Sequence, residues 1–177
     1  NPRGYMSVAF GRLKVVPKLR AVQAEYPDIR LSLTFTDRYV DLIEEGIDVA
    51  VRLGTLQDSS LIARRLTTAQ FNLVATPDYF AEHGRPRSLD DLAKHQCLAF
   101  TSRDTRLTRD WRFLAGGEET KLTPRGAMSF SDGGALCEAA CAGYGLAQMH
   151  DYYLDHEIAR GKLVPVLDKL KPPPDPI

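Results

Sequence analysis

The sequence predicts an α/β fold, and three observations carry this prediction. Apolar residues between positions 12 and 26 recur at close to 3.6-residue spacing, which indicates an amphipathic helix. Residues 29–35 alternate between apolar and polar side chains, the pattern of a half-buried strand. Residues 47–53 form a second strand pattern after a short helical stretch. A strand–helix–strand order of this kind is typical of parallel sheets covered by helices.

Local signals set the ends of the first elements. Pro17 lies inside the first helical pattern and is expected to kink that helix or to mark its true first turn. Pro27 then ends it. Thr36-Asp37 offers an N-cap for a short helix over residues 38–45, and Gly46 ends that helix.

The middle and the end of the chain continue the alternation. Ala50 within the 47–53 strand predicts burial on both faces, as in a parallel sheet, and residues 61–66 are expected to be extended. A strand at 71–75 precedes Thr76-Pro77, a hydroxyl N-cap followed by a first-turn proline. The same signals predict a helix ended by Gly84 and a second helix opened by the capping-box-like Ser88-Leu89-Asp90-Asp91. Strands are expected at 97–100, 111–113 and 127–130, with a hairpin turn at Gly116-Gly117-Glu118-Glu119. A helix at 134–142, a strand at 146–149, a helix at 151–160 and a strand at 163–167 follow, and Pro172-Pro173-Pro174 is expected to be an extended tail.

Composition excludes several classes of protein. The 23 Lys and Arg residues balance 23 Asp and Glu residues, so the basic excess of a lone nucleic-acid-binding domain is missing. No apolar run approaches the ~18 residues of a membrane span, and no signal peptide precedes the first pattern. The chain does not begin with Met, so we expect a fragment, a processed form or part of a longer protein.

Chemistry-bearing motifs are largely missing. Three cysteines do not form a closed disulfide set, and Cys137 and Cys141, four apart on one helix, are too far apart for easy bridging. We expect all three, Cys97 included, to be small buried hydrophobes in a reducing cytoplasm. The histidines show no zinc spacing, and the sequence contains neither a nucleophile elbow nor a phosphate loop. We therefore expect no enzyme activity, no cofactor and no metal.

Polar groups at helix starts that follow strands are the positive signal. In open α/β sheets, ligands bind outside the carboxyl ends of strands, where helix starts present free N–H groups. Three junctions fit this description: Val8-Ala9-Phe10-Gly11, Thr36-Asp37-Arg38 and Ser131-Asp132-Gly133. Plain helix capping is the alternative at each junction.

Several runs, taken in their order and spacing, form a more specific pattern. They are Phe10-Gly11-Arg12-Leu13, Pro17 and Leu19, Tyr26-Pro27-Asp28-Ile29, residues 31–54, residues 58–66, Ala75-Thr76-Pro77-Asp78-Tyr79-Phe80, His83-Gly84 with Pro86, Asp91-Leu92-Ala93, His95-Gln96-Cys97-Leu98, and Ala142-Gly143-Tyr144-Gly145-Leu146-Ala147. Together they resemble the effector-binding domain of LysR-type transcriptional regulators over nearly the whole chain.

The resemblance implies a two-lobed fold similar to type 2 periplasmic binding proteins, with a small-molecule effector in the cleft between the lobes. Residues 1–75 would form a partial lobe I, incomplete at the C-terminus, and residues 76–170 would form lobe II. Residues 171–177 would begin the return toward lobe I. It also implies a cytoplasmic homo-oligomer, a dimer or, at full length, a tetramer. In the dimer the first helix and second strand of lobe I would pack against lobe II of a partner. DNA would be bound only through an N-terminal winged helix-turn-helix that these residues do not include.

Carried over position by position, the resemblance selects the same junctions as the effector site. The implied effector-binding residues are Ala9, Phe10, Thr36, Asp37, Arg52, Gly54, Phe100, Thr101, Ser131, Asp132 and Gly133. Asp37 and Asp132 are acidic where many relatives are uncharged, so a ligand with an amine or hydroxyls would suit them. The alternative is that both carboxylates cap their own helices.

Two other functions use the same scaffold. A solute-binding protein of a transporter would need an export signal, and none is visible. An enzyme would need a nucleophile, a base or a metal set, and the sequence shows none.

Overall fold

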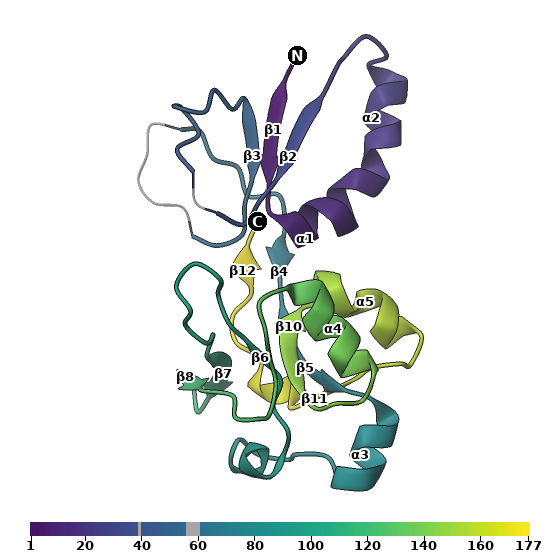
Figure 1. Ribbon diagram of the computed structural model, residues 1–177, viewed down its shortest axis with the longest axis vertical. Coiled ribbons are helices and arrows are strands. Elements are labelled where there is room, and N and C mark those ends of the chain that lie inside the picture. The colour runs from purple at the N-terminus through teal and green to yellow at the C-terminus, as the bar shows by residue number, and fades with distance from the viewer. Residues whose placement is uncertain (39, 56–60) are drawn as a thin grey trace. The chain divides into compact units, whose positions relative to one another are not determined.

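The computed structural model describes residues 1–38, 40–55 and 61–177. Tyr39 and residues 58–60, which belong to the family pattern, lie outside the described residues. The chain divides into two compact units: one holds Asn1–Ala69 with Asp175–Ile177, and the other holds Gln70–Pro174. Each unit is built around its own sheet (Figure 1).

The first unit contains a parallel three-stranded sheet in the order β2-β1-β3. Its strands are β1 (Arg3–Met6), β2 (Ser32–Phe35) and β3 (Val49–Val51). The strands predicted at 29–35 and 47–53 are confirmed in shorter form, whereas no residue range was predicted for β1. The predicted burial of the 47–53 strand on both faces is wrong, because β3 is an edge strand and its Val49 is 61% exposed.

A continuous helical segment follows β1 and is longer than predicted. It comprises α1 (Val8–Phe10), the wide turn η1 (Gly11–Val15), the tight turn η2 (Val16–Lys18) and α2 (Leu19–Glu25). Pro17 lies in the first turn of η2, where its missing N–H costs least, so the wide and tight turns beside it are the predicted irregularity. A side chain at Gly11 would lie 2.7 Å from Phe35 and 2.6 Å from Met6, so glycine allows the helix to approach the sheet.

The helix predicted at residues 38–45 is not formed in the part of that range that the structure describes. Asp41 instead accepts hydrogen bonds from the backbone N–H groups of Ile43 (2.9 Å) and Glu44 (3.1 Å). Ile47 then donates to the carbonyl of Leu42 over 2.9 Å. The side-chain cap at Asp41 opens only a short series of turns, which ends at Gly46 with a φ of +60°.

The second unit contains an antiparallel sheet in the order β10-β5-β11. Its strands are β5 (Phe71–Ala75), β10 (Ala147–His150) and β11 (Val164–Val166). All five residues of β5 are buried, so burial on both faces occurs here, in the central strand. The helices are α3 (Pro77–His83), η3 (Asp90–Lys94), α4 (Gly133–Cys141), α5 (Asp151–Ala159) and η4 (Asp168–Leu170).

Shorter strand pairs complete both units. In the second unit, β6 (Ala99–Phe100) pairs in parallel with β9 (Ser129–Phe130), and β7 (Trp111–Ala115) forms a hairpin with β8 (Glu118–Leu122). Glu118 and Glu119 lie in β8 and not in the predicted turn, which is confined to the two glycines before them. In the first unit, β4 (Thr68–Ala69) pairs with β12 (Asp175–Pro176), which follows the extended proline run.

Two apolar clusters sandwich the sheet of the second unit. One contains Leu73 with Trp111 and Phe113, and the other contains Val74 with Leu136 and Leu154. Alternate residues of β5 therefore enter opposite clusters, as the two-residue period of a strand requires. Figure 1 shows α4 and α5 beside β10, in agreement with their contacts to that strand.

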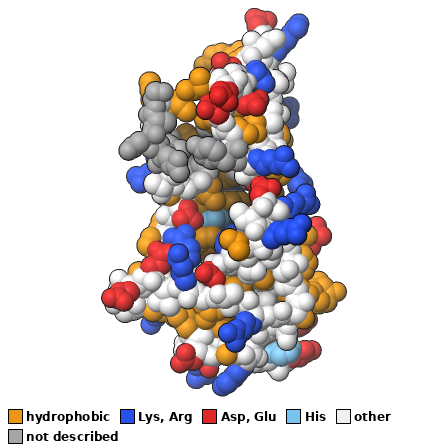
Figure 2. All heavy atoms as spheres, turned by 60° about the vertical axis from the view of Figure 1, so that its left-hand side comes forward, with side chains coloured by type: hydrophobic (Ala, Val, Ile, Leu, Met, Phe, Trp, Pro, Cys, Tyr) orange, Lys and Arg blue, Asp and Glu red, His pale blue; other side chains and the backbone are white. Residues whose placement is uncertain are grey.

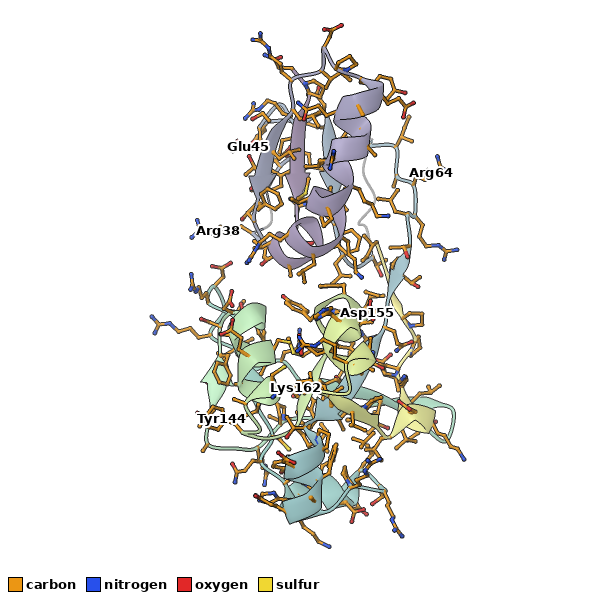
Figure 3. The ribbon with its side chains drawn as sticks, turned by 90° about the vertical axis from the view of Figure 1, so that its right-hand side faces the viewer. Arg38, Glu45, Arg64, Tyr144, Asp155 and Lys162 are labelled. Atoms are coloured by element: carbon orange, nitrogen blue, oxygen red, sulfur yellow. The ribbon has the colours of Figure 1, made fainter. Side chains whose placement is uncertain are left out.

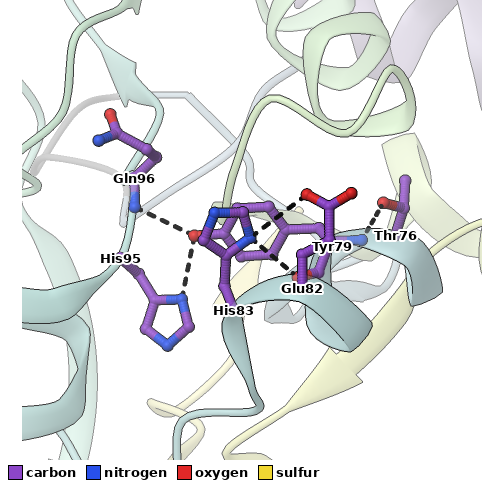
Figure 4. A network of polar contacts seen from close by, with 6 residues as sticks. All are labelled: Thr76, Tyr79, Glu82, His83, His95 and Gln96. Atoms are coloured by element: carbon purple, nitrogen blue, oxygen red, sulfur yellow. Dashed lines mark hydrogen bonds and ion pairs between the residues drawn. The ribbon is translucent and has the colours of Figure 1, made fainter.

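A polar network around the buried Tyr79 side chain of α3 lies at the edge of the apolar cluster that contains Trp111 (Figure 4). The backbone N–H of Gln96 donates to the Tyr79 hydroxyl over 3.1 Å, and that hydroxyl lies 3.0 Å from Nδ1 of His95. The hydroxyl donates to Nδ1 when that nitrogen is unprotonated and accepts from it when it carries the proton, so the tautomer of His95 sets the direction of this bond. Burial lowers the pKa of His95 and raises the pKa of Tyr79.

Candidate functional site

The three parallel strands of the first unit end at one edge of their sheet. Met6 is paired with Phe35 on one side and with Val51 on the other, so the residues that follow these strands are neighbours. The structure thereby brings together five predicted site residues, namely Ala9, Phe10, Thr36, Asp37 and Arg52.

Hydrogen bonds tie these strand ends to the helix start. The Thr36 N–H donates to the carbonyl of Met6 over 2.9 Å, and the Thr36 hydroxyl accepts from the N–H of Arg38 over 3.2 Å. Oδ1 of Asp37 accepts the N–H of Val8 over 3.0 Å. The carboxylate therefore satisfies a helix-start donor of the segment that follows β1, and its expected role as a cap of its own helix is wrong.

The other members of this set differ in character. Phe10 is buried, and the guanidinium carbon of Arg52 lies 5.5 Å from the centre of the Tyr5 ring. Gly54 lies two residues beyond Arg52 and donates its N–H to the carbonyl of Pro176 over 2.9 Å, so it is held by β12 and not by the strand ends.

Ser7 is a polar residue at this edge that the sequence reasoning missed. Its N–H donates to the carbonyl of Val51 over 3.2 Å, and its own carbonyl accepts from Gly11 over 2.9 Å. The Ser7 hydroxyl oxygen is buried without a hydrogen-bond partner among the described residues. The position of Ser7, a hydroxyl residue between the end of β1 and the start of α1, is the signal that could have identified it as a candidate site residue.

The second unit brings its predicted site residues to the end of the β6–β9 pair. Phe100 pairs with Phe130, and the Thr101 N–H donates to the carbonyl of Phe130 over 2.8 Å. Thr101 and Ser131 therefore follow directly from adjacent parallel strands. The Ser131 hydroxyl accepts from Nε of Arg103 over 3.4 Å, which brings a cation to this strand end.

Asp132 and Gly133 begin helix α4. Oδ1 of Asp132 accepts the N–H of Ala135 over 2.8 Å, so the carboxylate is the N-cap of its own helix, and this alternative from the sequence is confirmed. With Asp132 capping α4 and Asp37 bound to Val8, both carboxylates already have backbone donors. The pair of acidic residues thus gives no specific reason for an amine-bearing ligand.

An arginine beside Phe100 adds a cationic group that the sequence did not indicate. The guanidinium carbon of Arg109 lies 5.0 Å from the ring centre of Phe100 and 5.1 Å from that of Phe71. Its Nη2 donates to the carbonyl of Gln148 over 3.0 Å. Cation–π contact with two rings fixes the direction of this side chain.

Side chains on the face shown in Figure 2 mix both charges with apolar groups, as the zero net charge suggests. In residues 1–38, 40–55 and 61–177, His, Cys, Asp and Glu form no group of three that could hold a metal ion. Within the same residues, every helix is too short or too polar to cross a bilayer.

Sequence comparison identifies the family. The family model described as LysR substrate binding domain matches residues 5–177. The chain belongs to this family. This LysR substrate-binding domain is 39% identical over 171 residues to the HTH-type transcriptional regulator CrgA of Neisseria meningitidis, covering 94% of the chain and 56% of the regulator. The chain thus spans about half the length of the curated relatives that it matches.

Solved structures agree with this assignment. The regulatory domain of CrgA, a LysR-type transcriptional regulator from Neisseria meningitidis, matches with a TM-score of 0.84 and 32% identity, over 99% of this chain and 85% of that one. The regulatory domain of AphB in Vibrio vulnificus matches with a TM-score of 0.86 and 27% identity, over 99% and 87%. The predicted periplasmic-binding-protein-like α/β fold and the predicted family are confirmed.

Proposed function

We propose that this LysR substrate-binding domain binds a small-molecule effector at strand-end residues and thereby regulates transcription. The observation that carries the proposal is that each unit gathers hydroxyl groups and an arginine at the carboxyl ends of parallel strands. Ligands of α/β proteins bind at such ends. A ligand can shift a regulator only by as much as its affinity differs between the regulator's two states.

The charges nearest the strand ends support a particular class of effector. Asp37 and Asp132 each accept a backbone N–H, whereas Arg103 donates to Ser131 at the second unit's strand end. We therefore propose a neutral or carboxylate-bearing effector in place of the amine that two acidic side chains first suggested.

A thermal-shift screen tests this function. Aromatic acids, amino acids, sugars and quinone-like compounds are compared, and the effector class is expected to raise the melting temperature by binding the folded state. Thr36→Ala and Ser131→Ala each remove one hydroxyl worth about 1 kcal/mol, so each should weaken binding about fivefold. Thr34→Ala and Ser129→Ala, two residues earlier in the same exposed strands, are the matched controls.

The strand-end assignment would be wrong if no compound class shifted the melting temperature and the two test variants left the response of the full-length regulator unchanged. A transporter's solute-binding protein is not favoured, because the curated relatives are transcriptional regulators. We propose that DNA contacts belong to the helix-turn-helix region of the full-length regulator.

We also propose that the helical segment after β1 forms homo-oligomer contacts. Apolar side chains three to six residues apart along this segment are exposed: Leu13 is 45% exposed, Val16 44%, Val22 38% and Tyr26 50%. Large apolar side chains exposed together on one segment are typical of protein interfaces. Val16→Lys should reduce the sedimentation-derived mass toward that of a monomer, and Lys18→Ala on the same segment should not.

A further inference from the structure

Helix α4 carries two cysteines one turn apart, and neither belongs to the proposed effector site. Cys137 and Cys141 are each partly exposed, whereas the third cysteine, Cys97, is buried. Residues four apart lie on one face of a helix. Sγ of Cys137 lies 3.7 Å from the backbone carbonyl of Tyr153 on α5. Helix α4 therefore presents two thiols on one face, one turn apart.

The spacing of this pair disfavours a disulfide. Cβ atoms four residues apart on a helix are separated by about 5–6 Å, whereas a disulfide brings them to about 3.8 Å. Closing a direct S–S bond would therefore distort α4. One atom inserted between the two sulfurs lengthens the bridge by one bond and fits the helix without that distortion.

The surroundings also disfavour a zinc site. Structural zinc takes four ligands, and the described residues contain no group of three candidate ligands. Burial, the neighbouring Cys141 thiol and the charges of Glu157 and Glu138 raise the pKa of Cys137 to about 12, and burial also raises the pKa of Cys141. Both groups are thus neutral thiols at physiological pH, which makes them poor zinc ligands and slow nucleophiles, since the thiolate is the reactive form. At equilibrium, an As–OH group that leaves as water takes up each thiol proton, so an arsenical needs no prior ionisation of the pair.

We propose that Cys137 and Cys141 form a chelating site for a monosubstituted trivalent arsenical, a ligand that needs two thiols and a single bridging atom. In water such a compound carries two As–OH bonds. Each sulfur displaces one hydroxyl, so two As–S bonds form and two As–O bonds break, and the thiol protons leave with the hydroxyls as two water molecules. Arsenic stays trivalent throughout. The adduct would lie one turn from Gly133, the first residue of α4.

Intact-mass spectrometry of the native protein with equimolar phenylarsine oxide tests the site. The wild-type chain should gain one phenylarsenic group less two hydrogens, and excess 2,3-dimercaptopropanol should remove it whereas 2-mercaptoethanol at equal thiol concentration should not. Cys97→Ser should keep the adduct. Cys137→Ser and Cys141→Ser should each lose it, and Cys137→Ala repeats the test with an apolar replacement in case serine disturbs packing.

A matched variant separates the spacing of the thiols from their number. Glu138→Cys combined with Cys141→Ala keeps three cysteines but places two of them at adjacent positions, which do not face each other on a helix. This variant should not retain the arsenical against 2-mercaptoethanol. The proposal is overturned if the wild type takes up no arsenical, if Cys97→Ser loses the adduct, or if the matched variant binds as well as the wild type.

Discussion

Replacing Tyr79 by phenylalanine should destabilise the second unit through one hydroxyl group. That hydroxyl accepts from the N–H of Gln96 over 3.1 Å and shares a hydrogen bond of 3.0 Å with Nδ1 of His95, and Tyr79 is only 3% exposed. Phenylalanine fills the same space, so the apolar contacts remain, but the Gln96 N–H and the His95 nitrogen lose their partner in a buried environment. A buried group left unsatisfied costs about 1–3 kcal/mol, and we expect a total loss of about 2 kcal/mol.

Tryptophan fluorescence during urea unfolding measures this loss. Trp111 is the one tryptophan of the chain, is 2% exposed and belongs to the same apolar cluster as Tyr79, so it reports unfolding of this region. The midpoint should fall with an unchanged m-value, and the melting temperature should fall by about 4–8 °C.

An exposed tyrosine provides the control for this prediction. Tyr144, labelled in Figure 3 on the loop after α4, is 55% exposed, so Tyr144→Phe should change stability by less than about 0.5 kcal/mol. The reasoning is refuted if Tyr79→Phe falls within that same margin, or if both variants lose equal stability.

Three further predictions follow from single residues. Because burial lowers the pKa of His95 below 6.5, the folded state binds fewer protons than the unfolded state, so the free energy of unfolding should fall as pH drops below about 6.5 toward the lowered value. In urea titrations at several pH values, His95→Gln should flatten this slope and His156→Gln, at an exposed position, should not. Gly126→Ala should cost about 1–3 kcal/mol, because the added Cβ would lie 2.9 Å from the backbone nitrogen of Cys97 and closer still to its carbonyl oxygen; a melting temperature equal to that of the wild type would contradict this. Asp132→Ala should lower the free energy of unfolding, measured in urea, by about 1 kcal/mol, because the cap of α4 is lost. Asp132→Asn should keep both the stability and the effector response. A lost response in the asparagine variant would instead indicate that the charge contacts the ligand.

Elements built from short-range signals could be predicted from the sequence. Thr76 and Pro77 define the start of α3, and the Thr76 hydroxyl accepts the N–H of Tyr79 as a cap should. The Ser88–Asp91 capping box is also confirmed, since each residue's side chain accepts the other's N–H. In these cases the donor and the acceptor lie within a few residues, so the sequence holds the whole interaction.

Elements whose character depends on distant partners could not be predicted in the same way. The residues around Val49 have the apolar composition of a buried strand, but β3 is an edge strand. By contrast, β5 is buried on both faces because helices and the β7–β8 hairpin cover it. Likewise, nothing near Asp37 in the sequence shows that its carboxylate binds the N–H of Val8, 29 positions away.

By itself, the sequence determined the α/β class and the strand-end positions of the candidate site, because periodicity, caps and spacing are local properties of the chain. The family entered through the resemblance of several ordered runs of residues. Tertiary structure alone decided which strands pair in parallel, which residues are covered on both faces, and that the Asp37 carboxylate binds the N–H of Val8. Pairing and burial depend on contacts between segments far apart in the sequence, and no local pattern of residues encodes which segment arrives there.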